Sequence, residues 1–132
     1  MAFRSLPKID PIVPKRAACY LRVSTGRQAT NDVSIPSQRE LTRRYCEGKG
    51  WIVTEEFVEP GASATDDRRP EFQRMLDLAT STERRFDVIV VHAFSRFYRN
   101  GAEMELTIRK LRKHGVDVVS VPSPRETIRH RN

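Results

Sequence analysis

The sequence predicts an α/β protein in which a mostly parallel central sheet lies between two layers of helices, as a three-layer sandwich. Short valine-rich segments alternate along the chain with longer segments whose apolar residues recur at helical spacing. One short segment, residues 87–92, is apolar on both faces, which is typical of a central parallel strand. An alternation that begins and ends on a strand requires right-handed crossovers and helices on both faces of the sheet.

Strands are expected over residues 17–23, 51–58, 87–92 and 116–121. A first helix over 36–47 has Pro36 in its first turn, Gly48 as its stop, and Leu41 and Tyr45 on its inner face. A second helix opens at Pro70 and a third spans 101–113; their inward residues are Phe72, Met75, Leu76 and Ala79, then Met104, Ile108 and Leu111. This order indicates a flavodoxin-like layout, in which ligands bind beyond the carboxyl ends of the strands, near the first strand.

Composition limits the class of protein. The chain has 132 residues, 38% hydrophobic and 31% charged, which fits one soluble globular domain. No apolar run is long enough to span a membrane and no signal peptide is recognisable, so a cytoplasmic location is expected. Cys19 and Cys46 are expected to be packing residues, and the scattered histidines predict no metal site; no cofactor is expected. A net charge of +7 favours a polyanionic partner.

Three regions are expected along the chain. Residues 1–16, which contain Pro7, Pro11 and Pro14, should form a flexible N-terminal arm. Residues 17–121 should form the folded domain, and residues 122–132 a tail to which we assign no structure.

The end of the first strand carries unusual chemistry for a buried segment. In an extended strand Tyr20, Arg22 and Ser24 point to one face, while Cys19, Leu21 and Val23 point to the other. One face is therefore expected to be apolar and the other chemical. Because an unpaired buried guanidinium is costly, an anion should lie opposite Arg22.

Further arginines follow other strands at the same edge of the sheet. Arg96 and Arg99 are three residues apart after the third strand, where the first turn of a helix would place both on one face. Cations are disfavoured at a helix N-terminus, so the pair favours a bound anion over the alternative of two solvated arginines. Together with Arg22 and Arg69, these side chains surround Ser24. Guanidinium groups stabilise the charge that develops on a phosphodiester under attack, which favours phosphoryl transfer.

Other nucleophile and phosphate motifs are missing. Arg22 stands where the G-x-S-x-G elbow of an α/β hydrolase has glycine, and no G-x-x-x-x-G-K-[ST] loop is present. Both a serine hydrolase and a nucleoside-triphosphate enzyme are therefore disfavoured.

These residues resemble the motifs of the serine site-specific recombinases, which include resolvases, invertases and large serine integrases. The run Tyr20-x-Arg22-Val23-Ser24-Thr25, with Gln28 four residues past the serine, resembles the family's nucleophile motif. Gln38 resembles the glutamine of its first helix, and Arg69 before Pro70 resembles its mobile-loop arginine. Residues 95–100 are similar to its D-R-x-x-R-N segment. The resemblance covers residues 17–121, which would form a resolvase-like catalytic domain.

The resemblance implies a covalent mechanism on DNA. Ser24 would attack a DNA phosphodiester to form a 5′-phosphoserine link, and strand exchange and religation would follow. Arg22, Arg69, Arg96 and Arg99 would bind the phosphate, while Tyr20, Gln28, Gln38 and Ser95 would position it. Neither a metal nor another cofactor is implied. The chemistry serves DNA resolution, inversion or integration in mobile elements.

Two departures from the family pattern stand out. Ser95 replaces the usual aspartate; a serine can cap a helix but cannot hold a carboxylate's charge. The dimerising helix and DNA-binding domain of the family do not fit after residue 121. The chain is therefore expected to be a catalytic domain of a longer protein or the product of a truncated gene, with dimers or tetramers formed by the full-length protein.

Two other functions remain open on the residues alone. A non-catalytic α/β module could hold a phosphate or a nucleic-acid backbone with the same arginines, and would bind DNA without a covalent adduct. A serine hydrolase could use His92 as its base, although His92 is better explained as the end of a core strand.

Overall fold

The computed structural model describes residues 13–23, 33–59, 69–94 and 101–122, and the remaining residues are not discussed structurally. The elements, in chain order, are β1 (Arg16–Leu21), α1 (Ile35–Lys49), β2 (Ile52–Val58), α2 (Pro70–Ala79), β3 (Val88–Val91), α4 (Gly101–Lys113) and β4 (Asp117–Ser120). Arg16, which we placed in the N-terminal arm, is thus the first residue of β1.

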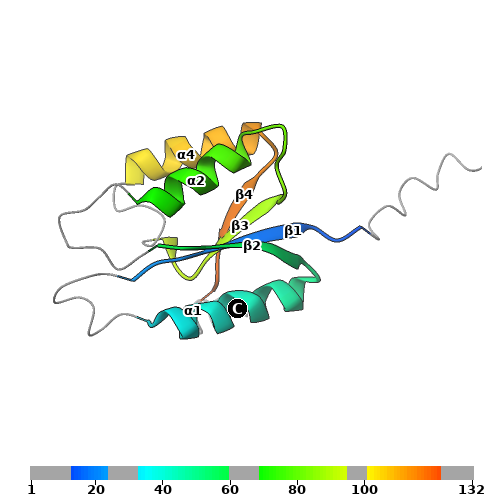
Figure 1. The fold of residues 1–132 in the computed structure, drawn as a ribbon, viewed down its shortest axis with the longest axis vertical. Helices are drawn as coiled ribbons and strands as arrows, with labels where there is room; N and C mark the ends of the chain where they lie inside the picture. The colour runs from blue at the N-terminus through cyan, green and yellow to red at the C-terminus, as the bar shows by residue number, and fades with distance from the viewer. Residues whose placement is uncertain (1–12, 24–32, 60–68, 95–100, 123–132) are drawn as a thin grey trace, which may run out of the picture.

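The strands form one sheet in the order β2-β1-β3-β4, and every neighbouring pair is parallel. Helix α1 covers one face of the sheet, and α2 and α4 cover the other (Figure 1). Helix α1 connects β1 to β2 on one side of it, and α2 and α4 then connect β2 to β3 and β3 to β4 in the opposite direction along the sheet. Because the helices lie on opposite faces for the two directions, the three crossovers have the same hand. The predicted three-layer α/β sandwich is confirmed. The strand order changes direction at β1, because β2 lies on one side of β1 and β3 lies on the other.

The sheet has a hydrophobic core on each face. Alternate residues of β1 and β3, including Tyr20 and Ile89, pack with α2 and α4. The intervening residues, including Cys19 and Val90, pack against α1. Both faces of β1 are therefore buried: on the face predicted to be chemical, Tyr20 is 0% exposed and its ring packs in the apolar core, while its hydroxyl makes polar contacts. The polar groups of that face lie toward the carboxyl end of β1, at Tyr20 and at Arg22 beyond it.

The inner face of α1 differs from the prediction. Leu41, which we placed inward, is 39% exposed, and Tyr45 is only partly buried. The buried residues are Gln38, Thr42 and Cys46, which are four residues apart and share one side of the helix. A buried polar row was not expected from hydrophobic periodicity. Both cysteines are buried and free, which confirms that they are packing residues.

The ends of several elements also differ from the prediction. Helix α1 continues through Gly48 and stops at Gly50, whose φ of 76° is left-handed and whose N–H bonds to the carbonyl oxygens of Cys46 and Glu47. Gly48 lies within the helix. The observed strands are shorter than predicted, and β1 ends at Leu21 rather than Val23.

The other two helices follow their predicted patterns. Phe72, Met75 and Ala79 of α2 are buried, and Leu111 of α4 is buried with Met104 and Ile108 packed beside it. Gly115, with φ of 84°, follows α4. In the part of the chain that the structure describes, no helix has the length and apolar character needed to cross a membrane.

Candidate active site

Tyr20, Arg22, Gln38 and Arg69 are the predicted site residues that the structure describes. The remaining predicted site residues lie outside the described part of the chain; they are Ser24, Gln28, Ser95, Arg96 and Arg99. The structure therefore shows the residues that come before and after the segment carrying Ser24.

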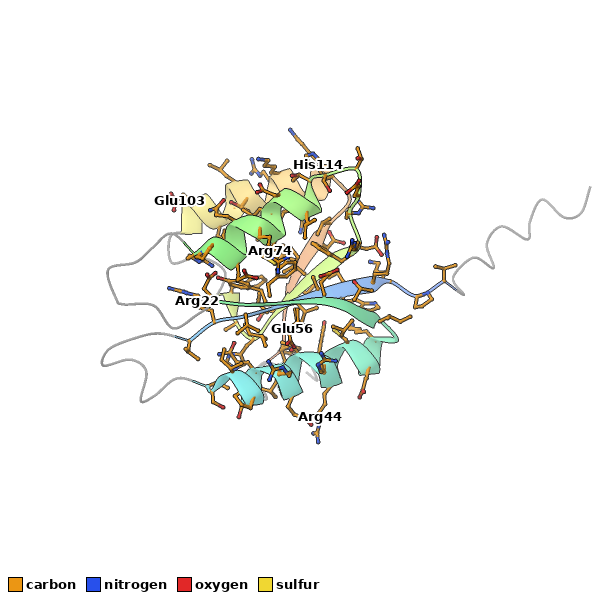
Figure 2. All side chains as sticks on the ribbon, in the orientation of Figure 1. Arg22, Arg44, Glu56, Arg74, Glu103 and His114 are labelled. Atoms are coloured by element: carbon orange, nitrogen blue, oxygen red, sulfur yellow. The ribbon has the colours of Figure 1, made fainter. Side chains whose placement is uncertain are left out.

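The described site residues gather at the carboxyl edge of the sheet. Arg22 follows the end of β1, Glu59 follows the end of β2, and Arg69 directly precedes α2. Because the strands are parallel, their carboxyl ends lie at the same edge. Figure 2 shows the Arg22 side chain at this edge, with the first turns of α1 and α2 on either side of the sheet. Ser24 comes two residues after Arg22 in the sequence.

Tyr20 joins Glu59 to Arg69 through its hydroxyl group. The hydroxyl donates to Glu59 Oε1 at 2.8 Å. It accepts from Arg69 Nε at 3.2 Å and from Arg69 Nη2 at 3.1 Å. The hydroxyl therefore acts as donor and acceptor at once, and connects a buried carboxylate with the guanidinium of a predicted phosphate ligand.

Glu59 also caps the N-terminus of α2. Its Oε2 accepts from the main-chain N–H of Glu71 at 3.2 Å, and its Oε1 accepts from that of Phe72 at 3.1 Å. Glu59 is only 5% exposed. A carboxylate is favoured at a helix N-terminus, because the main-chain N–H groups there have no partner within the helix. Glu59 thus fixes α2, Tyr20 and, through Tyr20, Arg69 with one carboxylate.

Glu59 was not predicted as a site residue. The sequence places it in a polar run that reads as a loop, and its partners lie 12, 13 and 39 residues away. The only signal for it was a carboxylate placed directly after a strand at the edge where arginines were expected.

Arg69 has an unusual main-chain conformation. Its φ of 47° and ψ of 66° are left-handed, which costs a non-glycine residue about 1 kcal/mol. Its guanidinium carbon lies 3.9 Å from the Phe72 ring centroid and 5.5 Å from that of Tyr20. Two aromatic rings and one hydroxyl therefore contribute to the direction of this guanidinium.

Tyr20 remains protonated at neutral pH. Burial raises the pKa of its hydroxyl well above the ordinary value, and the Arg69 charge opposes that rise without cancelling it. The hydroxyl can therefore keep donating to Glu59 at any physiological pH.

Gln38 contacts main-chain groups on both sides of the Ser24 segment. Its Oε1 accepts from Arg22 N at 3.2 Å, and its Nε2 donates to Arg22 O at 2.9 Å and to Val33 O at 2.8 Å. The anion expected opposite the Arg22 guanidinium stays a prediction. Within the described residues, no group of three or more His, Cys, Asp or Glu side chains could hold a metal ion.

Comparison with known proteins places this arrangement in a family. A family model described as the N-terminal domain of resolvase matches residues 17–131. The chain belongs to the resolvase N-terminal domain family. The resemblance to serine site-specific recombinases that the motifs indicated is confirmed.

Solved structures of this resolvase-type domain share the fold. The N-terminal catalytic domain of TP901-1 integrase is 26% identical with a TM-score of 0.69, over 86% of this chain and 88% of that one. A resolvase family site-specific recombinase from Streptococcus pneumoniae is 24% identical with a TM-score of 0.71, over 81% of this chain and 72% of that one. The C-terminal catalytic domain of ISC1926 TnpA, an IS607-like serine recombinase, is 24% identical with a TM-score of 0.66, over 87% and 76%.

A phage protein is similar to part of the chain. "Uncharacterized immunity region protein 3" of Bacillus phage phi105 is 38% identical over 68 residues, which are 52% of this chain and 83% of the relative. The match shows that a shorter protein is similar to about half of this chain.

Proposed function

We propose that this chain is the catalytic domain of a site-specific DNA recombinase and that Ser24 is its nucleophile. The observation that carries the proposal is the buried Tyr20–Glu59 pair, which holds the Arg69 guanidinium at the edge of a resolvase-type sheet. The chain leaves that edge two residues before Ser24. In this proposal the Arg69 guanidinium, held by Tyr20, is available to bind the phosphate that Ser24 attacks.

The reaction exchanges one phosphodiester for another. Ser24 Oγ forms a bond to phosphorus, the bond from phosphorus to the 3′ oxygen breaks, and the serine proton ends on the freed 3′ hydroxyl. The 5′-phosphoserine link keeps the energy of the original bond, so reversal after strand exchange reseals the DNA without nucleotide hydrolysis. The chemical steps therefore require a precise phosphate site more than an external energy source.

The proposed roles follow the charge that develops during attack. Arg22, Arg69, Arg96 and Arg99 would neutralise the non-bridging oxygens, and bidentate guanidinium groups suit this task. Tyr20, Gln28, Gln38 and Ser95 would position the phosphate or the groups that bind it. DNA is the proposed partner, consistent with a net charge of +7. Assembly into dimers or tetramers is proposed for the full-length protein.

A covalent adduct on Ser24 tests the proposal. The chain is incubated with a pool of random-sequence DNA duplexes, quenched in denaturant and digested with nuclease and trypsin. Cleavage after Arg22 and Arg27 yields the peptide 23–27, and a nucleotide attached to Ser24 is located in it by fragment mass spectrometry. Ser24→Ala should abolish the adduct, whereas Ser81→Ala, an exposed serine beyond α2, should leave it unchanged.

The non-catalytic binding module predicts a different outcome. Basic charge alone would give salt-dependent DNA binding that Ser24→Ala leaves intact, with no nucleotide on any serine. That result would overturn the recombinase proposal in favour of a phosphate-binding module.

A further inference from the structure

The Gln38 side chain is engaged by main-chain groups that come just before and after the segment carrying the predicted nucleophile. Gln38 is 0% exposed. Its carbonyl oxygen accepts one main-chain N–H, and its two amide hydrogens are each directed at a main-chain carbonyl. A side-chain amide has two hydrogens to donate, so its donor capacity is fully used by the protein itself.

Two of these bonds reproduce the pairing of a neighbouring strand. Gln38 accepts from the N–H of Arg22 and donates to the C=O of the same residue, at 3.2 Å and 2.9 Å. A strand residue makes this pair of bonds with the backbone of its neighbour in a sheet. β1 ends at Leu21, and helix α1 supplies the next partner through one side chain. The main-chain direction at Arg22 is therefore set by Gln38.

The third bond reaches the other side of the Ser24 segment. Gln38 Nε2 donates to Val33 O at 2.8 Å, and Arg22 and Val33 precede and follow Ser24 in the sequence. Gln38 is itself fixed in the first turn of α1, where its N–H donates to Ser34 O at 2.8 Å and Ser34 caps the helix. One rigidly held amide thus ties together both sides of the chain that carries the nucleophile.

Direct contact with a phosphate does not fit this geometry. A phosphate oxygen needs a donor, and both donors of Gln38 already serve partly buried main-chain carbonyl groups. Taking one of them away would leave a partly buried carbonyl without this partner, which costs free energy. Any influence of Gln38 on the proposed reaction must then act through the main chain of Arg22 and Val33.

We propose that Gln38 is a positioning residue, which sets the placement of Ser24 by holding the main chain at Arg22 and Val33, and that it does not bind the phosphate. The statement about Ser24 rests on the proposed recombinase function. The hydrogen-bonding part stands independently of it, since it concerns the protein without DNA.

Amide exchange tests the hydrogen bonds directly. In the full chain, Gln38→Met keeps the length of the side chain but removes the acceptor of the Arg22 N–H. Exchange of the Arg22 amide, followed by NMR, should become about fivefold faster or more, as expected for one lost hydrogen bond. Gln38→Asn, which keeps the amide but shortens its reach, should give a similar acceleration, so one of the two variants suffices.

Thr42→Val is the matched control. Thr42 is also buried in α1, one turn beyond Gln38, and its hydroxyl donates to Gln38 O at 2.9 Å without touching Arg22. The control should lower overall stability and leave Arg22 exchange, relative to the core amides, unchanged. Unaltered Arg22 exchange in both Gln38 variants would overturn the proposal.

Adduct formation tests the consequence for Ser24. With the random duplex pool, Gln38→Met should slow formation of the Ser24 adduct by about tenfold to a hundredfold at saturating DNA, because small misplacements of a reacting group have effects of this size. The Kd for the duplex should stay within about twofold, because no phosphate contact is lost.

The opposite pattern would overturn the proposal. A weakened Kd with an unchanged rate at saturation would make Gln38 a phosphate ligand, and an unchanged rate despite faster Arg22 exchange would remove its link to Ser24. If the unaltered chain forms no adduct, the recombinase function fails and with it the role toward Ser24. The Arg22 exchange result still decides whether Gln38 holds the chain.

Discussion

Tyr20 belongs to the hydrophobic core and to the candidate active site at once. Its ring packs with Phe72 at a centroid distance of 5.5 Å, while its hydroxyl lies between Glu59 and Arg69. The core therefore fixes the ring, and the ring fixes the position of a polar group that two charged side chains share. A change at this hydroxyl should affect both stability and chemistry.

Tyr20→Phe should lower the free energy of unfolding by about 1–2 kcal/mol, because it removes bonds to two charged groups from a buried place. It should also slow Ser24 adduct formation, since Arg69 loses the Tyr20 hydroxyl as an acceptor. Urea unfolding measures the first effect. Tyr45→Phe is the control: its ring packs against Trp51 on the other face of the sheet, and its change should stay within about 0.5 kcal/mol. Equal losses in the two variants would contradict the role given to the hydroxyl.

Asp87 ties the start of β1 to the start of β3 at the opposite edge. It accepts from the main-chain N of Arg16 at 3.0 Å and from the Arg16 guanidinium at 3.2 Å and 3.0 Å. The hydrogen bond from the Arg16 side chain is the main reason that the pKa of Asp87 is lowered from its ordinary value. A lowered pKa means that the folded state favours the charged carboxylate.

The stability that Asp87 contributes should therefore depend on pH. It is fully present above the unfolded-state pKa of about 4 and is lost as the pH falls through the lower folded-state pKa. Asp87→Asn should cost about 1–2 kcal/mol at pH 7 by urea unfolding, and the difference from the unaltered chain should shrink below about pH 4. Asp77→Asn, at an exposed position of α2, should show neither effect. A cost that is constant down to pH 2 would contradict the argument.

The sequence identified arginines at the site more easily than it identified what holds them. Arg22 was singled out because an unpaired buried cation at a strand end is costly, and Arg69 because it precedes Pro70 at the same edge and resembles the family's mobile-loop arginine. Glu59 and the contacts of Gln38 were not found, since each depends on partners from other elements. Burial of a polar side chain cannot be predicted when its partners are main-chain groups brought together only by the fold.

At the level of elements, α1 shows what periodicity can and cannot predict. Pro36 and the nearby glycines correctly indicated a helix in this region. Leu41 was wrongly placed inward because it is apolar. Tyr45 packs against the core as predicted but is only partly buried, and the fully buried row begins at Gln38. Because the Gln38 amide bonds to the main chain at the end of β1, the side of α1 that carries Gln38 faces the sheet.

The two glycines at the end of α1 should respond oppositely to alanine. Gly50→Ala should cost about 1 kcal/mol because its φ of 76° is left-handed. Gly48→Ala should stabilise the protein by about 0.5–1 kcal/mol because alanine favours a helix interior. An added Cβ meets nothing within 4 Å at either glycine, so steric contact does not obscure the comparison. Thermal unfolding of both variants measures it, and a stabilising Gly50→Ala would place the helix stop elsewhere.

The strands differ in how far the sequence determined them. β3 was well predicted because apolar residues on both faces can only lie between two layers. The end of β1 was predicted two residues too late, because alternation continues through Val23 while the hydrogen bonds of Arg22 go to Gln38. The sequence pattern shows which side chains alternate and does not show which backbone groups remain available.

Across the whole molecule, the two edges of the sheet have separate tasks. The edge where β1 and β3 begin is held by Arg16 and Asp87, and the edge where they end carries Tyr20, Gln38 and Arg69. A strand of six residues separates them by roughly 20 Å. We therefore expect that the fold can be weakened at one edge without disturbing the proposed chemistry at the other.

Asp87→Asn and Gln38→Met should separate these tasks. Their losses in free energy of unfolding should add to within about 0.5 kcal/mol in the double variant, because the sites are distant. At temperatures well below unfolding, Asp87→Asn should leave the rate of Ser24 adduct formation unchanged, while the double variant should be as slow as Gln38→Met alone. Urea unfolding and the adduct assay measure these quantities. A slower rate in Asp87→Asn alone would show that the two edges are coupled.

The buried cysteines allow the rate at which the α1 layer separates from the sheet to be measured. Cys19 lies on β1 and Cys46 on the facing side of α1; both are 0% exposed, and they are the two cysteines of the chain. A thiol-alkylating reagent can reach them only when the α1 layer separates from the sheet. The rate of alkylation in native buffer therefore counts spontaneous separations of the layer that also carries Gln38, with no label added to the protein.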